Sequence, residues 1–202
     1  MLKMLYKALE NPALYDMTQK LLGGDRVYKK LKEAIAAQLK NISYNNVLDV
    51  GCGTGLFTDC FKGEYTGIDI NEGYIKKARS DKKGAFKTGD ATALQFEDET
   101  FDLVFTLGVL HHLDAGNREK MLKEMRRVCK TGGHILIVDG LVPSNRLNVV
   151  GYALAKLDRG PFKMRIDMFQ EMVNSAYPNA GLIKYTHIKS FPHELIAAIV
   201  RR

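Results

Sequence analysis

Glycines and acidic residues are spaced along the first half of the chain in a way that suits a ligand containing a ribose. Gly51, Gly53 and Gly55 follow the apolar run Leu48–Val50. Glycines at such a turn permit positive φ and let the backbone approach a ligand closely. Asp69 ends a second apolar run, where a carboxylate can accept hydrogen bonds from both ribose hydroxyls.

The glycine spacing excludes two familiar nucleotide-binding loops. A nicotinamide fingerprint of the form GxGxxG needs its third glycine at position 56, which is Leu56. A phosphate-binding P-loop would continue into Gly-Lys-Ser/Thr, and none follows here.

Two adjacent histidines are the candidates for acid–base chemistry. His111 and His112 come shortly after the strongly apolar run Phe101–Leu107. Imidazole titrates near neutrality, so either ring could take a proton from a hydroxyl or a protonated amine. The alternative is that the rings only pack or line a pocket. The histidines have no metal-ligand spacing, so no metal site is predicted; they are His111, His112, His134, His187 and His193.

The chain resembles the class I S-adenosylmethionine-dependent methyltransferases over about residues 46–140. Asp49 and the glycine loop after it resemble motif I of that family, and Gly89-Asp90-Ala91 resembles its adenine-binding position. The block from Phe101–Val104 to Val109–Leu113 is similar to the fourth-strand region of small-molecule members, particularly the group called type 11.

The resemblance implies S-adenosylmethionine as methyl donor and S-adenosylhomocysteine as product. It implies that the glycine loop lies against the methionine part, that Asp69 binds the ribose, and that Asp90 and the next backbone N–H bind adenine. Tyr15 would belong to an N-terminal lid over the donor. The implied donor-binding residues are Asp49, Gly51, Cys52, Gly53, Gly55, Asp69, Ile70, Asp90, Ala91, Leu107 and Tyr15.

Alternating strand and helix patterns predict an α/β fold of Rossmann-like, doubly wound type. We expect a seven-stranded sheet, mostly parallel, with an antiparallel C-terminal hairpin formed by Leu182–Ser190 and Glu194–Val200. Helices are expected at Asn71–Ser80, Asn117–Lys130 and directly after the glycine loop. The other expected strands are 47–50, 65–70, 85–87, 101–107 and 134–138.

The first 40 residues predict helices that form a lid. Pro12 can open a helix, Gly23-Gly24 can end it, and Asp25 can cap the next one. The whole chain reads as one methyltransferase domain. Its expected parts are the lid (1–40), the donor-binding core (46–140), a substrate-side insertion (141–180) and the C-terminal hairpin (181–202).

Charge is distributed unevenly along the chain. The net charge is +7, with +4 in residues 1–46, −2 in 47–142 and +5 in 143–202. A basic excess outside the donor-binding core suits an anionic acceptor, bound for example by Arg26, Arg146, Arg159 and Arg165. The alternative is that these side chains are solvated and bind no acceptor. Three cysteines without CxxC spacing, and no secretory signal or membrane-spanning run, favour a cytoplasmic location.

Missing motifs narrow the acceptor to a small molecule. After the fourth apolar run there is no N/D-P-P-Y/F motif, no proline precedes a cysteine, and no paired-glutamate loop is present. The N-terminal signature of the quinone C-methyltransferases is also missing. The basic residues lack the aromatic interleaving that stacks bases, which argues against a nucleic-acid partner. Nothing in the sequence indicates an oligomeric state.

Three other functions stay open. The segment 146–159 has apolar residues at helical spacing among Arg146, Lys156 and Arg159, which suits a lipid-linked or phosphorylated acceptor at a membrane surface. A non-catalytic domain that only binds the donor is the second alternative. An RNA methyltransferase is the third, and a steep salt dependence of RNA binding would support it.

Overall fold

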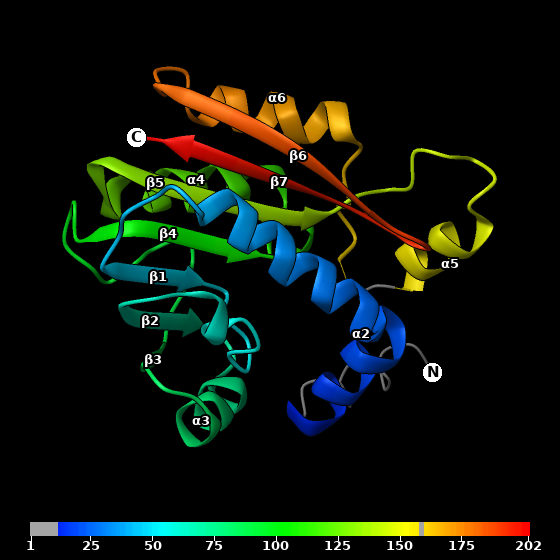
Figure 1. Ribbon diagram of the computed structural model, residues 1–202, viewed down its shortest axis with the longest axis horizontal. Coiled ribbons are helices and arrows are strands. Elements are labelled where there is room, and N and C mark those ends of the chain that lie inside the picture. Colours follow the sequence, from blue (N-terminus) through cyan, green and yellow to red (C-terminus); the bar gives the residue numbers. More distant parts are fainter. Residues whose placement is uncertain (1–11, 158–159) are drawn as a thin grey trace.

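The computed structural model describes residues 12–157 and 160–202, with side chains from residue 26 onward except that of Leu157. A seven-stranded sheet runs through the molecule in the order β3-β2-β1-β4-β5-β7-β6 (Figure 1). The strands are β1 (Asn46–Val50), β2 (Glu64–Asp69), β3 (Ala85–Thr88), β4 (Phe101–Leu107), β5 (Cys129–Gly140), β6 (Leu182–Ser190) and β7 (His193–Arg201).

Strand direction confirms the predicted mixture. The first five strands pair in parallel, and β7 pairs antiparallel with both β5 and β6. Parallel strands end at the same edge of a sheet, so the carboxyl ends of β1 to β5 converge. The helices are α2 (Pro12–Leu39), α3 (Glu72–Asp81), α4 (Ala115–Val128), α5 (Val149–Leu157) and α6 (Ile166–Ala176), with 3-10 turns η1 (Thr58–Cys60) and η2 (Leu110–His112).

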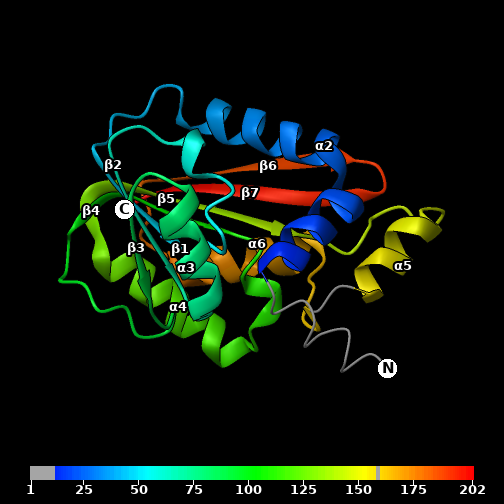
Figure 2. The ribbon, with the colours of Figure 1, turned by 90° about the horizontal axis from the view of Figure 1, so that it is seen from below.

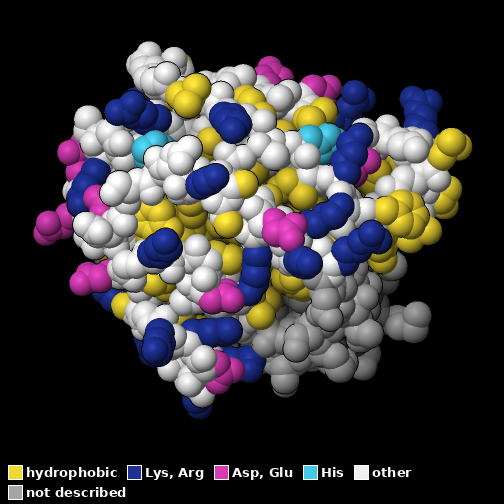
Figure 3. Space-filling model, viewed as in Figure 1, with side chains coloured by type: hydrophobic (Ala, Val, Ile, Leu, Met, Phe, Trp, Pro, Cys, Tyr) yellow, Lys and Arg dark blue, Asp and Glu magenta, His cyan; other side chains and the backbone are white. Residues whose placement is uncertain are grey.

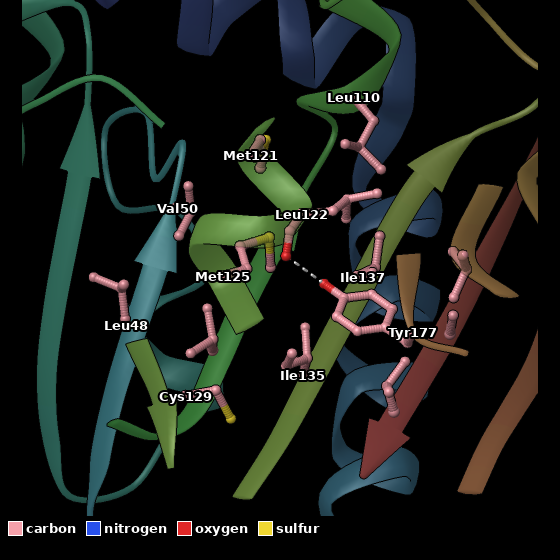
Figure 4. Packing of buried hydrophobic residues seen from close by; sticks show 14 of the residues in the cluster. Leu48, Val50, Leu110, Met121, Leu122, Met125, Cys129, Ile135, Ile137 and Tyr177 are labelled. Atoms are coloured by element: carbon pink, nitrogen blue, oxygen red, sulfur yellow. Dashed lines mark hydrogen bonds between the residues drawn. The ribbon is translucent and has the colours of Figure 1, made fainter. Parts of the chain in front are cut away.

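Helices cover both faces of the sheet (Figure 2). Two apolar clusters are buried between the helices and the sheet, one on each face. In β1 the side chain of Val47 joins the cluster beneath α2 and α3, while Leu48 joins the cluster beneath α4 and α6. This alternation is the period-two pattern of a strand that is buried on both faces. Tyr177, at the end of α6, donates a hydrogen bond to the carbonyl of Leu122 in α4 at 3.1 Å and so ties the two helices together (Figure 4).

The helices after β2 and β4 start at side-chain caps. Asn71 accepts a hydrogen bond from the backbone N–H of Tyr74, and Asp114 accepts one from that of Asn117. Such caps satisfy N–H groups that have no partner inside the helix. The predicted helix positions there are right to within two residues at each end.

The prediction of a helix break at Gly23-Gly24 is wrong. Helix α2 runs without interruption from Pro12 to Leu39. A mid-helix glycine costs about 1 kcal/mol, which tertiary packing can offset. The packing comes from one buried stripe against the sheet, formed by Val27, Leu31, Ile35 and Leu39. Residues 27–39 of α2 therefore pack against the sheet as part of the fold. The lid remains a prediction for the residues before them.

The helix expected directly after the glycine loop is also absent from this described segment. Only the 3-10 turn η1 lies between β1 and β2. Eight residues separate Gly55 from the first residue of β2, too few for a helix that could cover the sheet. Thr58 closes the turn by donating both its backbone N–H and its hydroxyl to the carbonyl of Gly55. Among the described residues, no helix is both long and apolar enough to cross a bilayer.

Candidate active site at the carboxyl edge of the sheet

The glycine loop turns back onto the end of β2. The backbone N–H groups of Gly51 and Cys52 both donate to the carbonyl of Ile68, at 2.8 and 2.9 Å. Gly51, Gly53 and Gly55 all have positive φ, which non-glycine residues adopt at a cost. A Cβ on Gly51 would also overlap the side chain of Val109, so both the backbone conformation and the packing require glycine there.

Asp69 is held in place by the backbone of the loop. Its Oδ2 accepts from the N–H of Gly53 at 2.9 Å, and its Oδ1 accepts from the N–H of Asn71 at 2.8 Å. Burial raises the pKa of Asp69, and these two backbone hydrogen bonds oppose that rise. A carboxylate has about four acceptor sites, so it can still accept hydrogen bonds from a diol.

Asp49 lies deeper than the sequence suggests. Its carboxylate is buried beneath the loop and accepts a hydrogen bond from the hydroxyl of Tyr65 on β2. The pKa of Asp49 is raised to about 7. Burial is the main cause, the nearby Asp69 carboxylate adds to the rise, and the hydrogen bond from Tyr65 opposes it. Burial also raises the pKa of the Cys52 thiol. Tyr65 was not predicted, because its side chain gives no spacing signal toward Asp49.

The predicted adenine-side residues follow β2 and β3. Asp90 is exposed, and its Oδ1 accepts from the backbone N–H and the hydroxyl of Thr92, both at 2.8 Å. These hydrogen bonds lower the pKa of Asp90. Ile70, beside Asp69, leaves an apolar side chain 76% exposed. Ala91 packs partly against the core, and the N–H of Gly89 donates to the carbonyl of Asp69 at 3.0 Å.

The end of β4 brings Leu107 and the two histidines to the same edge. His111 is buried, and its Nδ1 lies 2.5 Å from Oδ1 of Asp139 at the end of β5. The backbone N–H of His111 donates to the other oxygen of Asp139 at 3.1 Å. The exposed ring of His112 lies 4.1 Å from the His111 ring, centroid to centroid. Asp139 was missed, although an acidic residue directly after the apolar run of β5 was a signal.

The chain after α5 closes over His111. A Cβ on Gly160 would overlap the His111 ring, and the N–H of Phe162 donates to the carbonyl of His111 at 3.1 Å. Arg118 of α4 holds this segment through hydrogen bonds to the carbonyls of Leu110 and Phe162, at 3.0 and 2.7 Å. Residues 160–162, within the expected insertion (141–180), therefore border the histidine.

Similar proteins agree on one family. A family model described as a methyltransferase domain matches residues 48–137. A demethylmenaquinone methyltransferase from Bacteroides fragilis is 30% identical over 90% of this chain and 74% of its own length. The chain belongs to the class I S-adenosylmethionine-dependent methyltransferases.

Other matches of this methyltransferase show how widely the core is shared. An Arabidopsis thaliana tRNA (carboxymethyluridine(34)-5-O)-methyltransferase is 38% identical over 51% of this chain and 26% of its own length. A Thermotoga maritima S-adenosylmethionine-dependent methyltransferase of known structure has a TM-score of 0.73 at 18% identity, covering 97% of this chain and 99% of its own. The chain spans less than half the length of several curated relatives that it matches.

The donor-side residues of the methyltransferase suit S-adenosylmethionine. Three side chains lie at or just after the ends of the neighbouring strands β2 and β3: the Asp69 carboxylate, the exposed Ile70 and the Asp90 carboxylate. This order suits a ribose followed by an adenine. No group of three metal-ligating side chains was found in the described part of the chain. Tyr15 lies on α2, and its side chain is outside the described ones.

Proposed function

We propose that the chain transfers a methyl group from S-adenosylmethionine to a small molecule by in-line displacement. The observation that carries this proposal is the Asp69 carboxylate, clamped by the glycine loop at the carboxyl edge. The sulfonium group of the bound donor supplies an activated methyl. The chain's task is then to align the acceptor with that methyl and to exclude water.

Calorimetric titration tests the donor. S-adenosylmethionine and S-adenosylhomocysteine should both bind, and NAD should not, because the loop lacks the third glycine of a nicotinamide fingerprint. Binding of NAD alone would refute the proposal. A methyl-transfer assay on a panel of small acceptors separates a catalytic domain from one that only binds the donor.

His111 is the proposed base. The Asp139 carboxylate orients its ring through Nδ1, which makes Nε2 the atom that receives a proton from an acceptor hydroxyl or ammonium group. His112 is the alternative, because its ring is exposed beside that of His111. If the acceptor atom carries no proton to lose, neither histidine acts as a base.

Variants of the two histidines separate these roles. His111→Gln should lower kcat by roughly 100-fold, in line with the usual contribution of a positioned base, and should leave donor affinity unchanged. His112→Gln is the matched control and should change kcat little. The reverse order would assign the proton transfer to His112, and two unaffected variants would rule out both.

An acceptor bearing a carboxylate or phosphate is the finer part of the proposal. Of the four arginines that suggested it, Arg26 and Arg146 are exposed, Arg165 pairs with Asp167 at 3.3 Å, and Arg159 lies outside the described residues. Lys163 is better placed, since its Nζ lies 3.8 Å from where a Cβ of Gly140 would stand, next to Asp139.

Acceptors matched as neutral and anionic pairs test this charge preference. The anionic members should have the lower KM, and Lys163→Gln should remove that difference. Arg165→Gln is the control, because it removes one positive charge from an exposed position two residues further along the chain. Equal KM values within each pair for the unmodified enzyme would end the anionic-acceptor proposal and leave the donor proposal intact.

A further inference from the structure

Large apolar side chains are exposed at one corner of the molecule. Leu147 (86% exposed), Val149 (70%) and Val150 (52%) lie at the start of α5, and Phe191 (74%) lies in the turn between β6 and β7. We define these four residues as the α5 corner. Four scattered residues make up the rest of the large apolar side chains found exposed in the described structure: Ile70, Phe162, Met168 and Leu182.

The two segments of the α5 corner are joined. The buried side chain of Asn148 donates from Nδ2 to the carbonyl of Pro192 at 2.8 Å, and its Oδ1 accepts from the N–H of Gly151 at 2.9 Å. Gly151 lies so close to Pro192 that a Cβ on it would overlap the Pro192 carbonyl. Both ribbon views place α5 beside this turn (Figures 1 and 2). The corner is therefore a fixed feature of the surface.

Positive charge surrounds the α5 corner. Arg146, Lys156 and Lys189 are exposed, and no ion pair involves them among the residues the structure describes. The sequence has no acidic residue from 143 to 157 or from 186 to 193. Glu194 follows, but it is buried and accepts a hydrogen bond from Ser144 while lying 3.1 Å from His187. Figure 3 shows apolar side chains gathered over α5, with Lys and Arg side chains beside them.

We infer that the α5 corner is a docking surface for an anionic lipid membrane. Apolar side chains that project among exposed cations suit an interface where acyl chains meet anionic headgroups. A protein partner fits less well. Protein interfaces are depleted in Lys, and a stable one buries about 800 Å² on each partner, far more than four side chains provide.

Docking at this corner would also serve the proposed function, and this link to catalysis rests on that function. Helix α5 ends at Leu157, three residues before Gly160, which contacts the His111 ring. The segment that would contact the membrane is therefore followed, within a few residues, by the segment that borders the proposed acceptor site.

Co-sedimentation of the full chain with lipid vesicles tests the inference. Vesicles of phosphatidylcholine alone are compared with an equal mixture of phosphatidylcholine and phosphatidylglycerol. The protein should bind the anionic vesicles preferentially, and added salt should weaken that binding. Equal binding to both, or binding to neither, would overturn the inference.

Matched variants locate the contact. The double variant Leu147→Ser, Phe191→Ser should lower binding to anionic vesicles by about 100-fold or more, since each of the two buried apolar side chains contributes at least about 1.5 kcal/mol. Lys156→Gln, Lys189→Gln should lower it about fivefold for each charge removed, at about 1 kcal/mol per charge. The control is Met168→Ser, Leu182→Ser, which removes two exposed apolar side chains elsewhere and should change nothing.

Two further readouts keep the result independent of folding and of catalysis. Each variant should keep the thermal midpoint and the calorimetric donor affinity of the unmodified chain, so a loss of vesicle binding cannot come from unfolding. Light scattering measures the mass in solution. A dimer that only the Leu147→Ser, Phe191→Ser variant dissociates would assign the corner to a second copy and overturn the membrane inference.

Discussion

Asp69 ends β2 and Asp90 lies two residues after the neighbouring strand β3, yet the two acids lie in different surroundings. Asp69 is half-buried and accepts hydrogen bonds from two backbone N–H groups, so its position is coupled to the glycine loop. Asp90 is exposed, and among the described residues its hydrogen bonds come from Thr92, two residues further along the chain. Removing the first should disturb both the ribose contact and the loop, whereas removing the second should disturb one contact.

We therefore expect Asp69→Ala to weaken S-adenosylmethionine binding more than Asp90→Ala. A hydrogen bond to a charged group contributes about 1.5–3 kcal/mol, so two lost bonds should cost at least about tenfold in affinity. Calorimetry on folded variants measures the difference. Asp81→Ala, an exposed acid at the end of α3 paired with Lys77, is the control. Equal or reversed losses would show that the two roles are assigned wrongly.

Asp49 should make stability depend on pH. Its pKa is raised from 3.8 to about 7 in the folded chain, so folding favours the protonated form. The stabilisation is complete below pH 3.8 and is lost as pH rises through about 7, at about 1.4 kcal/mol per pH unit between the two values. Asp49→Asn should remove this dependence. The free energy of unfolding of the variant, relative to that of the unmodified chain, should therefore be higher at pH 8 than at pH 5.

Urea unfolding at both pH values measures this change. Tyr65→Phe is the informative companion variant, because it removes the hydrogen bond that lowers the pKa of Asp49 and should move the loss to higher pH. A constant difference between Asp49→Asn and the unmodified chain at both values would mean that Asp49 does not titrate in this range.

Residues with a characteristic spacing could be placed from the sequence, and their partners could not. The three glycines and Asp69 stand in a local pattern, and the structure places them together at the sheet edge. Tyr65 contacts Asp49, and both Asp139 and Gly160 contact His111. In each case the two partners are far apart in sequence. Such contacts are set by strand register and loop packing, which no local pattern encodes.

At the scale of elements, the sequence predicts periodic segments well and misjudges glycine. The apolar runs at 47–50 and 101–107 produced the expected strands β1 and β4, and the helix expected after Asp25 lies within α2. Gly23-Gly24 favoured a helix end on local propensity alone, but the buried stripe of α2 holds one continuous helix. The glycine loop lacks its expected helix because the next strand begins too soon.

The contact between the insertion and His111 should tolerate no added side chain. Gly160→Ala would force its new methyl group into the His111 ring, so we expect about 1–3 kcal/mol of destabilisation and a lower kcat. Gly181→Ala is the control, since nothing lies within 4 Å of the added methyl. Urea unfolding and a methyl-transfer assay measure the two effects. Identical behaviour of the two variants would mean that residues 160–162 rearrange freely.

For the molecule as a whole, the shared core and the variable ends serve different tasks. Relatives named for a tRNA and for demethylmenaquinone match this chain, so the donor-binding core does not by itself select the acceptor. In this chain the net positive charge comes from the segments on either side of that core, whose own net charge is −2 over residues 47–142. The sequence could therefore predict the fold and the kind of donor, while selection of the acceptor by the insertion and the N-terminal segment stays a prediction.

Methyl transfer by the whole enzyme should not need a metal ion. No group of metal-ligating side chains is present among the described residues, and an activated sulfonium methyl needs no Lewis acid. Activity on any acceptor found should survive dialysis against a chelator, with the dialysed enzyme and buffer-treated enzyme compared at equal concentration. Loss of activity that only an added divalent metal restores would contradict this prediction.

The position of β7 has a consequence for how the chain acquires its structure. In the described sheet, strand β6 lies at the edge and pairs with β7, which connects it to β5. During synthesis β6 therefore emerges before the strand that attaches it to the sheet exists. The edge of β5 stays open until then, and Arg202 completes the closure by exchanging backbone hydrogen bonds with Gly132 and Gly133. An incomplete chain that ends before residue 193 would thus expose two unpaired strand edges at once, the kind of surface on which nascent chains associate with one another.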